Sequence, residues 1–166
     1  MILIMACGNS LRRDDGAGLL LAEKLEELYL ARQLKVHRIA VQQLTPELSE
    51  IISDDAVSKI VFVDTRVVKT GSRKQAIQIQ QLPNGNASPS CGHHLDPLAL
   101  MIYACRLFGK RPPAWKVSVP GVDFGHGEGL SEISRRAIVE VQDSVAAKML
   151  DFPAKLTGSQ RTVSEF

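Results

Sequence analysis

Five short runs along the chain have the hydrophobic patterns of β-strands. Residues 2–7 and 59–64 are nearly continuous in apolar side chains, which is typical of strands buried on both faces of a sheet. Residues 35–41 and 75–82 alternate apolar and polar side chains, as half-buried strands do, and the second is expected nearer a sheet edge. Residues 114–119 form a further strand. The pattern predicts a sheet of about five strands.

Helical patterns separate these runs. Between residues 15 and 31, apolar side chains recur at spacings of three and four. Thr45-Pro46-Glu47 has the N-cap, proline and acidic residue that open a short helix to about residue 53. Asp96-Pro97 opens another helix to about residue 108, with Gly109 placed to end it.

A final helix is predicted from residue 131 to residue 149. Strands that alternate with helices predict an α/β fold, in which a mainly parallel, twisted sheet is covered on both faces.

Length and composition favour one small globular domain. Of the 166 residues, 1–150 are expected to form a single domain and 151–166 a flexible tail. The net charge of +2 is too small to indicate a nucleic-acid partner. No stretch approaches the roughly 20 apolar residues of a membrane helix, and the three cysteines are scattered, so we expect free thiols and a cytoplasmic location.

Candidate chemistry gathers where strands lead into loops. Asp14 and Asp15 follow the first strand, Asp64 ends the third, and His93 with His94 precedes the helix that starts near residue 97. In parallel α/β folds, ligands bind beyond the carboxyl ends of the strands, where such loops converge. Two carboxylates and an imidazole that meet there can bind a divalent metal.

Simpler interpretations remain for each of these residues. An acidic pair in the first loop would repel a phosphate. The simpler role for one of Asp14 and Asp15 is to cap the following helix. Asp64 can equally be a hydrogen-bonded loop carboxylate, and the two histidines a polar loop pair. Arg12 and Arg13 could hold a peptide carboxylate or carbonyl, although such pairs are more often solvated.

Other catalytic arrangements find little support. The sequence has no Gly-x-Ser-x-Gly elbow, no HExxH motif and no paired CxxC. Cys91 lies two residues before His93, but an ordinary loop thiol is the expected case. The loop with His126 and Glu128 is at most a pocket wall.

Three segments resemble the nickel–iron hydrogenase maturation proteases, which trim the C-terminus of the hydrogenase large subunit after nickel insertion. The resemblance lies in Gly8-Asn9-x-Leu11-x-x-Asp14-Asp15-x-x-Gly18, in "VFVD" ending at Asp64, and in "GHHLDPLALMIYA". A late "GEGLS" also matches, so the similarity extends to about residue 150.

This resemblance implies a three-layer α/β/α sandwich and a nickel-recognising site at Asp15, Asp64 and His93, which would also be the catalytic residues. His93 is preferred to His94 because the family pattern places an apolar residue, here Leu95, two positions after the ligand. The nickel would be supplied by the substrate, a hydrogenase large-subunit precursor, although another divalent metal is possible. No membrane or nucleic-acid partner is expected, and the protein is expected to act as a monomer.

Two other functions are compatible with the same residues. One is a free-standing metallohydrolase or aminopeptidase that carries its own zinc or manganese. The other is a nickel-binding assembly factor without hydrolytic activity.

Overall fold

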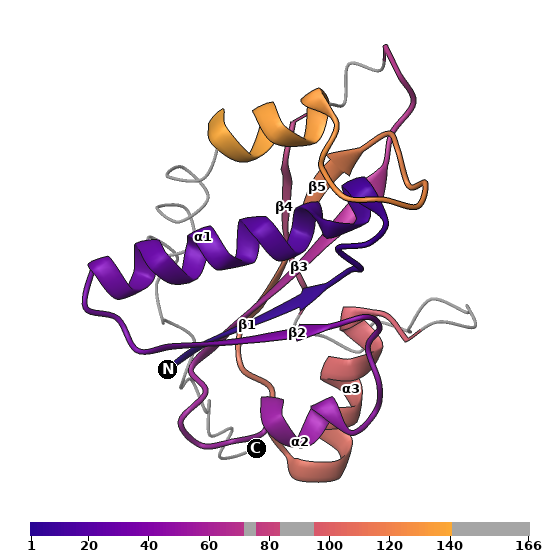
Figure 1. The fold of residues 1–166 in the computed structure, drawn as a ribbon. Helices are drawn as coiled ribbons and strands as arrows, with labels where there is room; N and C mark the ends of the chain where they lie inside the picture. Colours follow the sequence, from indigo (N-terminus) through magenta and orange to yellow (C-terminus); the bar gives the residue numbers. More distant parts are fainter. Residues whose placement is uncertain (72–75, 84–94, 141–166) are drawn as a thin grey trace, which may run out of the picture.

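The computed structural model describes residues 1–71, 76–83 and 95–140 (Figure 1). Its strands are β1 (Ile2–Cys7), β2 (Val36–Val41), β3 (Lys59–Val67), β4 (Gln78–Gln81) and β5 (Ala114–Gly121). Its helices are α1 (Ala17–Ala31), α2 (Leu48–Ile52) and α3 (Pro97–Phe108), with a 3₁₀ turn, η1 (Arg13–Gly16), before α1. Residues 132–140 are also helical.

The described strands form one sheet in the order β2-β1-β3-β5-β4. The neighbouring strands β2, β1, β3 and β5 are parallel. The edge strand β4 pairs antiparallel with β5. Parallel neighbours need crossover connections, and α1 and α2 provide those from β1 to β2 and from β2 to β3. The predicted α/β fold with a mainly parallel sheet of about five strands is confirmed.

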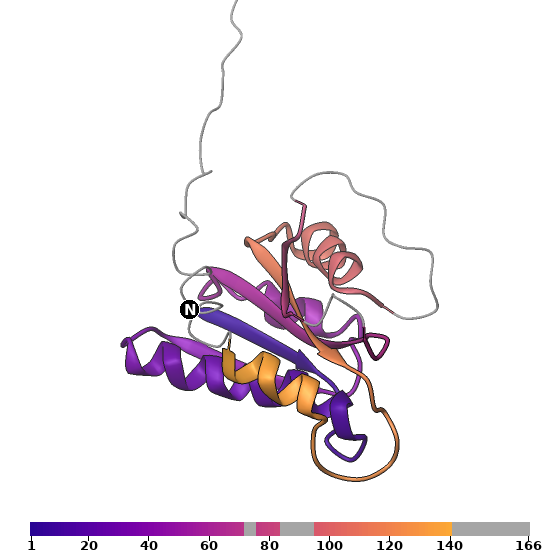
Figure 2. The same cartoon turned by 90° about the horizontal axis from the view of Figure 1, so that it is seen from above.

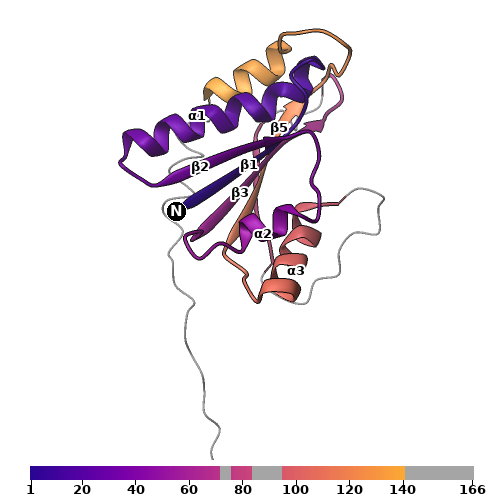
Figure 3. The ribbon, with the colours of Figure 1, turned by 60° about the horizontal axis from the view of Figure 1, so that its bottom comes forward.

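Helices cover both faces of this sheet. On one face, α1 and residues 132–140 pack against Ile4, Val63 and Val117; on the other, α2 and α3 pack against Met5 and Phe62 (Figures 2 and 3). Successive strand residues point to opposite faces, so each buried strand contributes to two cores. The result is the three-layer α/β/α arrangement that the family resemblance implied.

The helix α3 follows its predicted boundaries. The Asp96 carboxylate accepts a hydrogen bond of 2.7 Å from the Ala99 N–H, and Pro97 stands at the first helical position. Gly109 ends the helix with a positive φ of 69°, a conformation that costs glycine little.

Several predicted boundaries were wrong, and three of them bear on the site. The helix α2 begins at Leu48 because residues 45–47 form a separate turn, in which the Leu48 N–H bonds the Thr45 carbonyl. The helix α1 begins at Ala17, after η1. Asp64 does not end its strand, since pairing with β5 continues to Val67.

Several predictions fall on residues outside the described ranges. Cys91, His93 and His94 are among them, as are the end of the last helix and the tail at 151–166, so the assignment of residues 1–150 to one domain stays a prediction. No helix within the described ranges is long and apolar enough to cross a membrane.

Candidate functional site

The first loop and strand β3 pack closely where β1 ends. The Gly18 N–H donates a hydrogen bond of 3.0 Å to Thr65 Oγ1, and a Cβ on Gly18 would lie 3.1 Å from the Asp64 Cα. Glycine at position 18 therefore lets the start of α1 approach β3 directly. This packing brings the loop that carries Asp14 and Asp15 beside the Asp64 backbone.

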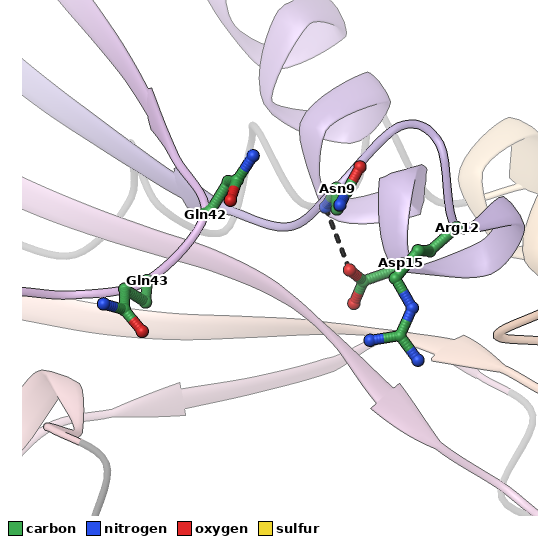
Figure 4. A pocket seen from close by; sticks show the side chains of 5 residues that line it. All are labelled: Asn9, Arg12, Asp15, Gln42 and Gln43. Carbon is green, nitrogen blue, oxygen red and sulfur yellow. Dashed lines mark hydrogen bonds between the residues drawn. The ribbon is translucent and has the colours of Figure 1, made fainter. Parts of the chain in front are cut away.

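Asp15 is half-buried at the rim of a cavity of about 460 Å³. Its Oδ2 accepts a hydrogen bond of 3.0 Å from the Asn9 N–H, which orients the carboxylate (Figure 4). The cavity is also lined by Arg12, Gln42 and Gln43. Its described lining is entirely polar or charged, as suits a hydrophilic ligand.

Asp64 lines a second cavity, of about 250 Å³, on the sheet face covered by α2 and α3. Burial raises the pKa of the Asp64 carboxyl and the nearby Asp15 charge adds to this, while the Thr65 N–H and Lys116 oppose it. Gln42 and Gln43 line this cavity as well as the first. The structure thus brings Asp15 and Asp64 to two adjoining cavities.

Cys7 also lines the Asp64 cavity, at the end of β1. Burial and the charge of Asp64 raise the pKa of this thiol to about 12, although Lys116 lowers it. At neutral pH the group is a neutral thiol and a poor nucleophile. The pKa of Cys7 therefore does not favour a thiolate nucleophile in this cavity.

Asp14 has a different environment from Asp15. It is fully buried, and its carboxylate accepts hydrogen bonds from the N–H groups of Val122 (2.8 Å), Asp123 (2.9 Å) and Ser131 (2.7 Å). Burial would raise its pKa, but these donors outweigh burial and lower it.

The predicted capping role was wrong, because neither Asp14 nor Asp15 caps η1 or α1. Asp14 instead ties the first loop to residues 122–131.

The arginines of the first loop contact the same late loop. Arg12 donates a hydrogen bond of 3.3 Å to the Phe124 carbonyl, and Arg13 forms an ion pair with Asp123. His126 and Glu128 are exposed and line neither of the two cavities. Arg12, by contrast, lines the Asp15 cavity and is available to a ligand there.

The third predicted residue, His93, lies outside the described residues. Within residues 1–71, 76–83 and 95–140, no group of three or more His, Cys, Asp or Glu side chains could hold a metal ion. The shared site of Asp15, Asp64 and His93 therefore stays a prediction. The next described residue after the histidines, Leu95, lines the Asp64 cavity.

Sequence reasoning missed three polar residues of these cavities, Gln42, Gln43 and Lys116. Gln42 and Gln43 directly follow β2, so the strand-end rule that selected the aspartates could have found them. Lys116 is the lone charge in the otherwise apolar start of β5, and a charge in a buried strand could also have been noticed in the sequence. It lies diagonally from Asp64, since Lys116 pairs with Phe62 and Ser118 with Asp64.

Comparison with known proteins bears on the fold. The sequence matches no protein-family model and has no significant match among curated proteins. Solved structures do match. The hydrogenase maturating endopeptidase HybD from E. coli aligns with a TM-score of 0.64 and 20% identity, over 90% of this chain and 92% of that one.

Two further structures give the same result. The [NiFe] hydrogenase maturation protease HycI from Thermococcus kodakarensis aligns with a TM-score of 0.59 and 22% identity, over 90% of this chain and 92% of that one. The endopeptidase HycI from Escherichia coli aligns with a TM-score of 0.56 and 18% identity, over 90% and 91%. The protein therefore has the fold of the nickel–iron hydrogenase maturation proteases, as its sequence motifs implied.

Proposed function

We propose that this protein is an endopeptidase that removes the C-terminal extension of a nickel-loaded hydrogenase large-subunit precursor. The observation that carries the proposal is that the fold and the position of the two aspartates agree. A chain with the fold of the maturation endopeptidases has Asp15 and Asp64 at adjoining cavities beyond the carboxyl ends of its parallel strands. These are the positions that the motif resemblance selected independently of any structure.

In this proposal the nickel ion is part of the substrate. Asp15 and Asp64 offer carboxylate oxygens from two separate segments, and His93 is the proposed third ligand. His93 precedes Leu95 by two residues, and Leu95 lines the Asp64 cavity. Carboxylate and imidazole groups together suit a borderline divalent ion. Recognition of bound nickel would dock only those precursors that already contain the metal.

The hydrolytic step has two routes that use the same groups. In one, a carboxylate acts as a general base on water, and the pKa of Asp64, raised by burial, makes it a stronger base than an ordinary aspartate. In the other, Asp15, Asp64 and His93 would hold a metal ion, which would supply a Lewis acid for the scissile carbonyl. In both routes one peptide bond is hydrolysed in a cleft formed by the first loop and the β2–α2 loop.

The direct test is incubation of the purified protein with precursor, with and without nickel, followed by intact-mass measurement. We expect a shortened product only from the nickel-loaded form. Asp15→Ala, Asp64→Asn and His93→Ala should each abolish processing. Asp55→Asn is the matched control, since Asp55 is exposed, pairs with Lys110 and lines neither cavity. Processing at the wild-type rate by Asp15→Ala or His93→Ala would refute the assignment.

Metal analysis, peptide assays and precursor binding by the same protein separate the two alternatives. Stoichiometric metal in the freshly purified protein, together with activity on short peptides, would indicate a metallohydrolase with its own ion. A stable complex with an intact precursor would indicate an assembly factor. We expect neither result, and we expect the protein to act as a monomer in the cytoplasm.

A further inference from the structure

The loop after β2 carries two exposed glutamines, Gln42 and Gln43, which join the two halves of the candidate site. Both line the polar cavity beside Asp15, and both also line the cavity that contains Asp64. Figure 4 shows their carboxamides diverging, with that of Gln42 on the side of Asn9 and that of Gln43 farther from it. These two side chains therefore lie at the boundary between the two cavities.

Neither carboxamide is used by the fold within the described residues. No hydrogen bond from either side chain reaches a described residue, whereas the Asn9 Oδ1 beside them accepts a hydrogen bond of 2.9 Å from the Leu11 N–H. A carboxamide offers two N–H donors and one carbonyl acceptor. That set is complementary to the C=O and N–H groups of a peptide main chain.

The two cavities differ in character, and this difference fits an extended chain better than a compact ligand. The Asp15 cavity is lined by polar and charged side chains, while Leu44, Phe62 and Leu95 give the Asp64 cavity a mainly apolar wall. A small metabolite would occupy one cavity or the other. A polypeptide segment can place different side chains in each while its main chain crosses the boundary between them.

We propose that Gln42 and Gln43 bind the main chain of an extended polypeptide segment where it crosses between the Asp15 and Asp64 cavities. This inference rests on the proposed function, since the segment would be the C-terminal extension of the precursor. Main-chain binding is largely independent of side-chain identity. It would hold the scissile bond against the carboxylates while the metal supplies selectivity.

Steady-state cleavage of nickel-loaded precursor tests this inference. The double variant Gln42→Ala/Gln43→Ala should raise KM about tenfold, because it removes two to three hydrogen bonds to the substrate. Its kcat should stay within about threefold of wild type, since neither residue takes part in the chemical step. Gln42→Glu/Gln43→Glu keeps the size of the side chains but loses the N–H donors, and should raise KM at least as much.

Two controls isolate the effect. Gln81→Ala changes an exposed glutamine on the edge strand β4, outside both cavities, and should leave KM unchanged. Binding of a mature large subunit that lacks the extension should be equal for wild type and the double alanine variant. Equal melting temperatures would show that the double variant is folded.

The outcomes distinguish this inference from the proposed function. If wild type cleaves the precursor and the double alanine variant has the same KM, the glutamines do not bind the segment. A fall in kcat alone, or a Glu variant that behaves as wild type, would also overturn main-chain binding. If wild type neither cleaves nor binds the precursor, the proposed function itself fails.

Discussion

Substitution of the two adjacent aspartates of the first loop should affect different properties, stability for Asp14 and processing for Asp15. Asp14 is fully buried and accepts three backbone hydrogen bonds of 2.7–2.9 Å from residues 122, 123 and 131. Asp15 is half-buried and accepts one, of 3.0 Å, from the Asn9 N–H. Asp14→Ala should therefore destabilise the protein, whereas Asp15→Ala should mainly abolish processing.

The magnitude follows from the donors that Asp14→Ala would leave without a partner. A hydrogen bond to a charged group contributes roughly 1.5–3 kcal/mol, and a buried N–H without a partner costs a similar amount. The three bonds share one carboxylate and are not additive, so we expect the free energy of unfolding to fall by about 3–5 kcal/mol. Asp15→Ala loses one partly exposed bond, and about 1 kcal/mol or less.

Guanidinium denaturation of the two variants at pH 7 measures this difference. The same measurement in acid tests its electrostatic origin. Because the pKa of Asp14 is lowered in the folded state, its stabilisation is fully present above the ordinary aspartate pKa of about 3.9 and is lost as pH falls through the folded pKa. The gap between wild type and Asp14→Ala should narrow in strong acid. Equal destabilisation by Asp14→Ala and Asp15→Ala at pH 7 would refute the reasoning.

Three further predictions concern stability and reactivity near the site. Asp64→Asn should raise the melting temperature at pH 7, because burial raises the pKa of Asp64 and its ionised form therefore destabilises the fold. That gain should shrink as pH falls through the folded pKa and disappear below about pH 4, and a gain that persists there would contradict it. Gly8→Ala should lower the free energy of unfolding in denaturant by roughly 2–4 kcal/mol. Gly8 has a φ of 152°, and a Cβ there would lie 2.1 Å from the Asp15 carbonyl oxygen. A fall of under about 1 kcal/mol would be inconsistent with this geometry. Iodoacetamide should label Cys7 at pH 8 roughly a hundredfold or more slowly than it labels N-acetylcysteine, because a pKa of about 12 leaves little thiolate. Peptide mapping measures the labelling rate of Cys7, and unfolding in urea should restore the rate of an ordinary thiol.

Local patterns predicted most of the fold. The strand β1 and the helix α3 have the predicted boundaries, because each is specified by neighbours in sequence: a continuous apolar run, or an N-cap, a proline and a terminal glycine. The parallel sheet with helices on both faces followed from the alternation of these elements. The motif resemblance led to the same architecture.

Boundaries that depend on distant partners were wrong. The strand β3 runs past Asp64 because residues 64–67 pair with Ser118 to Gly121 of β5, more than fifty positions away. The start of α2 was wrong for a local reason, since a turn at residues 45–47 replaced the first turn of the predicted helix. Hydrophobic periodicity contains no information on either event.

The sequence by itself determined the class of the fold, the strand ends at which polar groups collect and the motif that selected Asp15, Asp64 and His93. Only the tertiary structure showed that Asp14 is a buried hydrogen-bond acceptor, since its donors are the N–H groups of residues 122, 123 and 131. It alone showed that Gln42 and Gln43 border both cavities. The physical reason is range: propensity, capping and periodicity act over a few residues, whereas burial, charge and hydrogen bonding at a site depend on segments that only folding brings together.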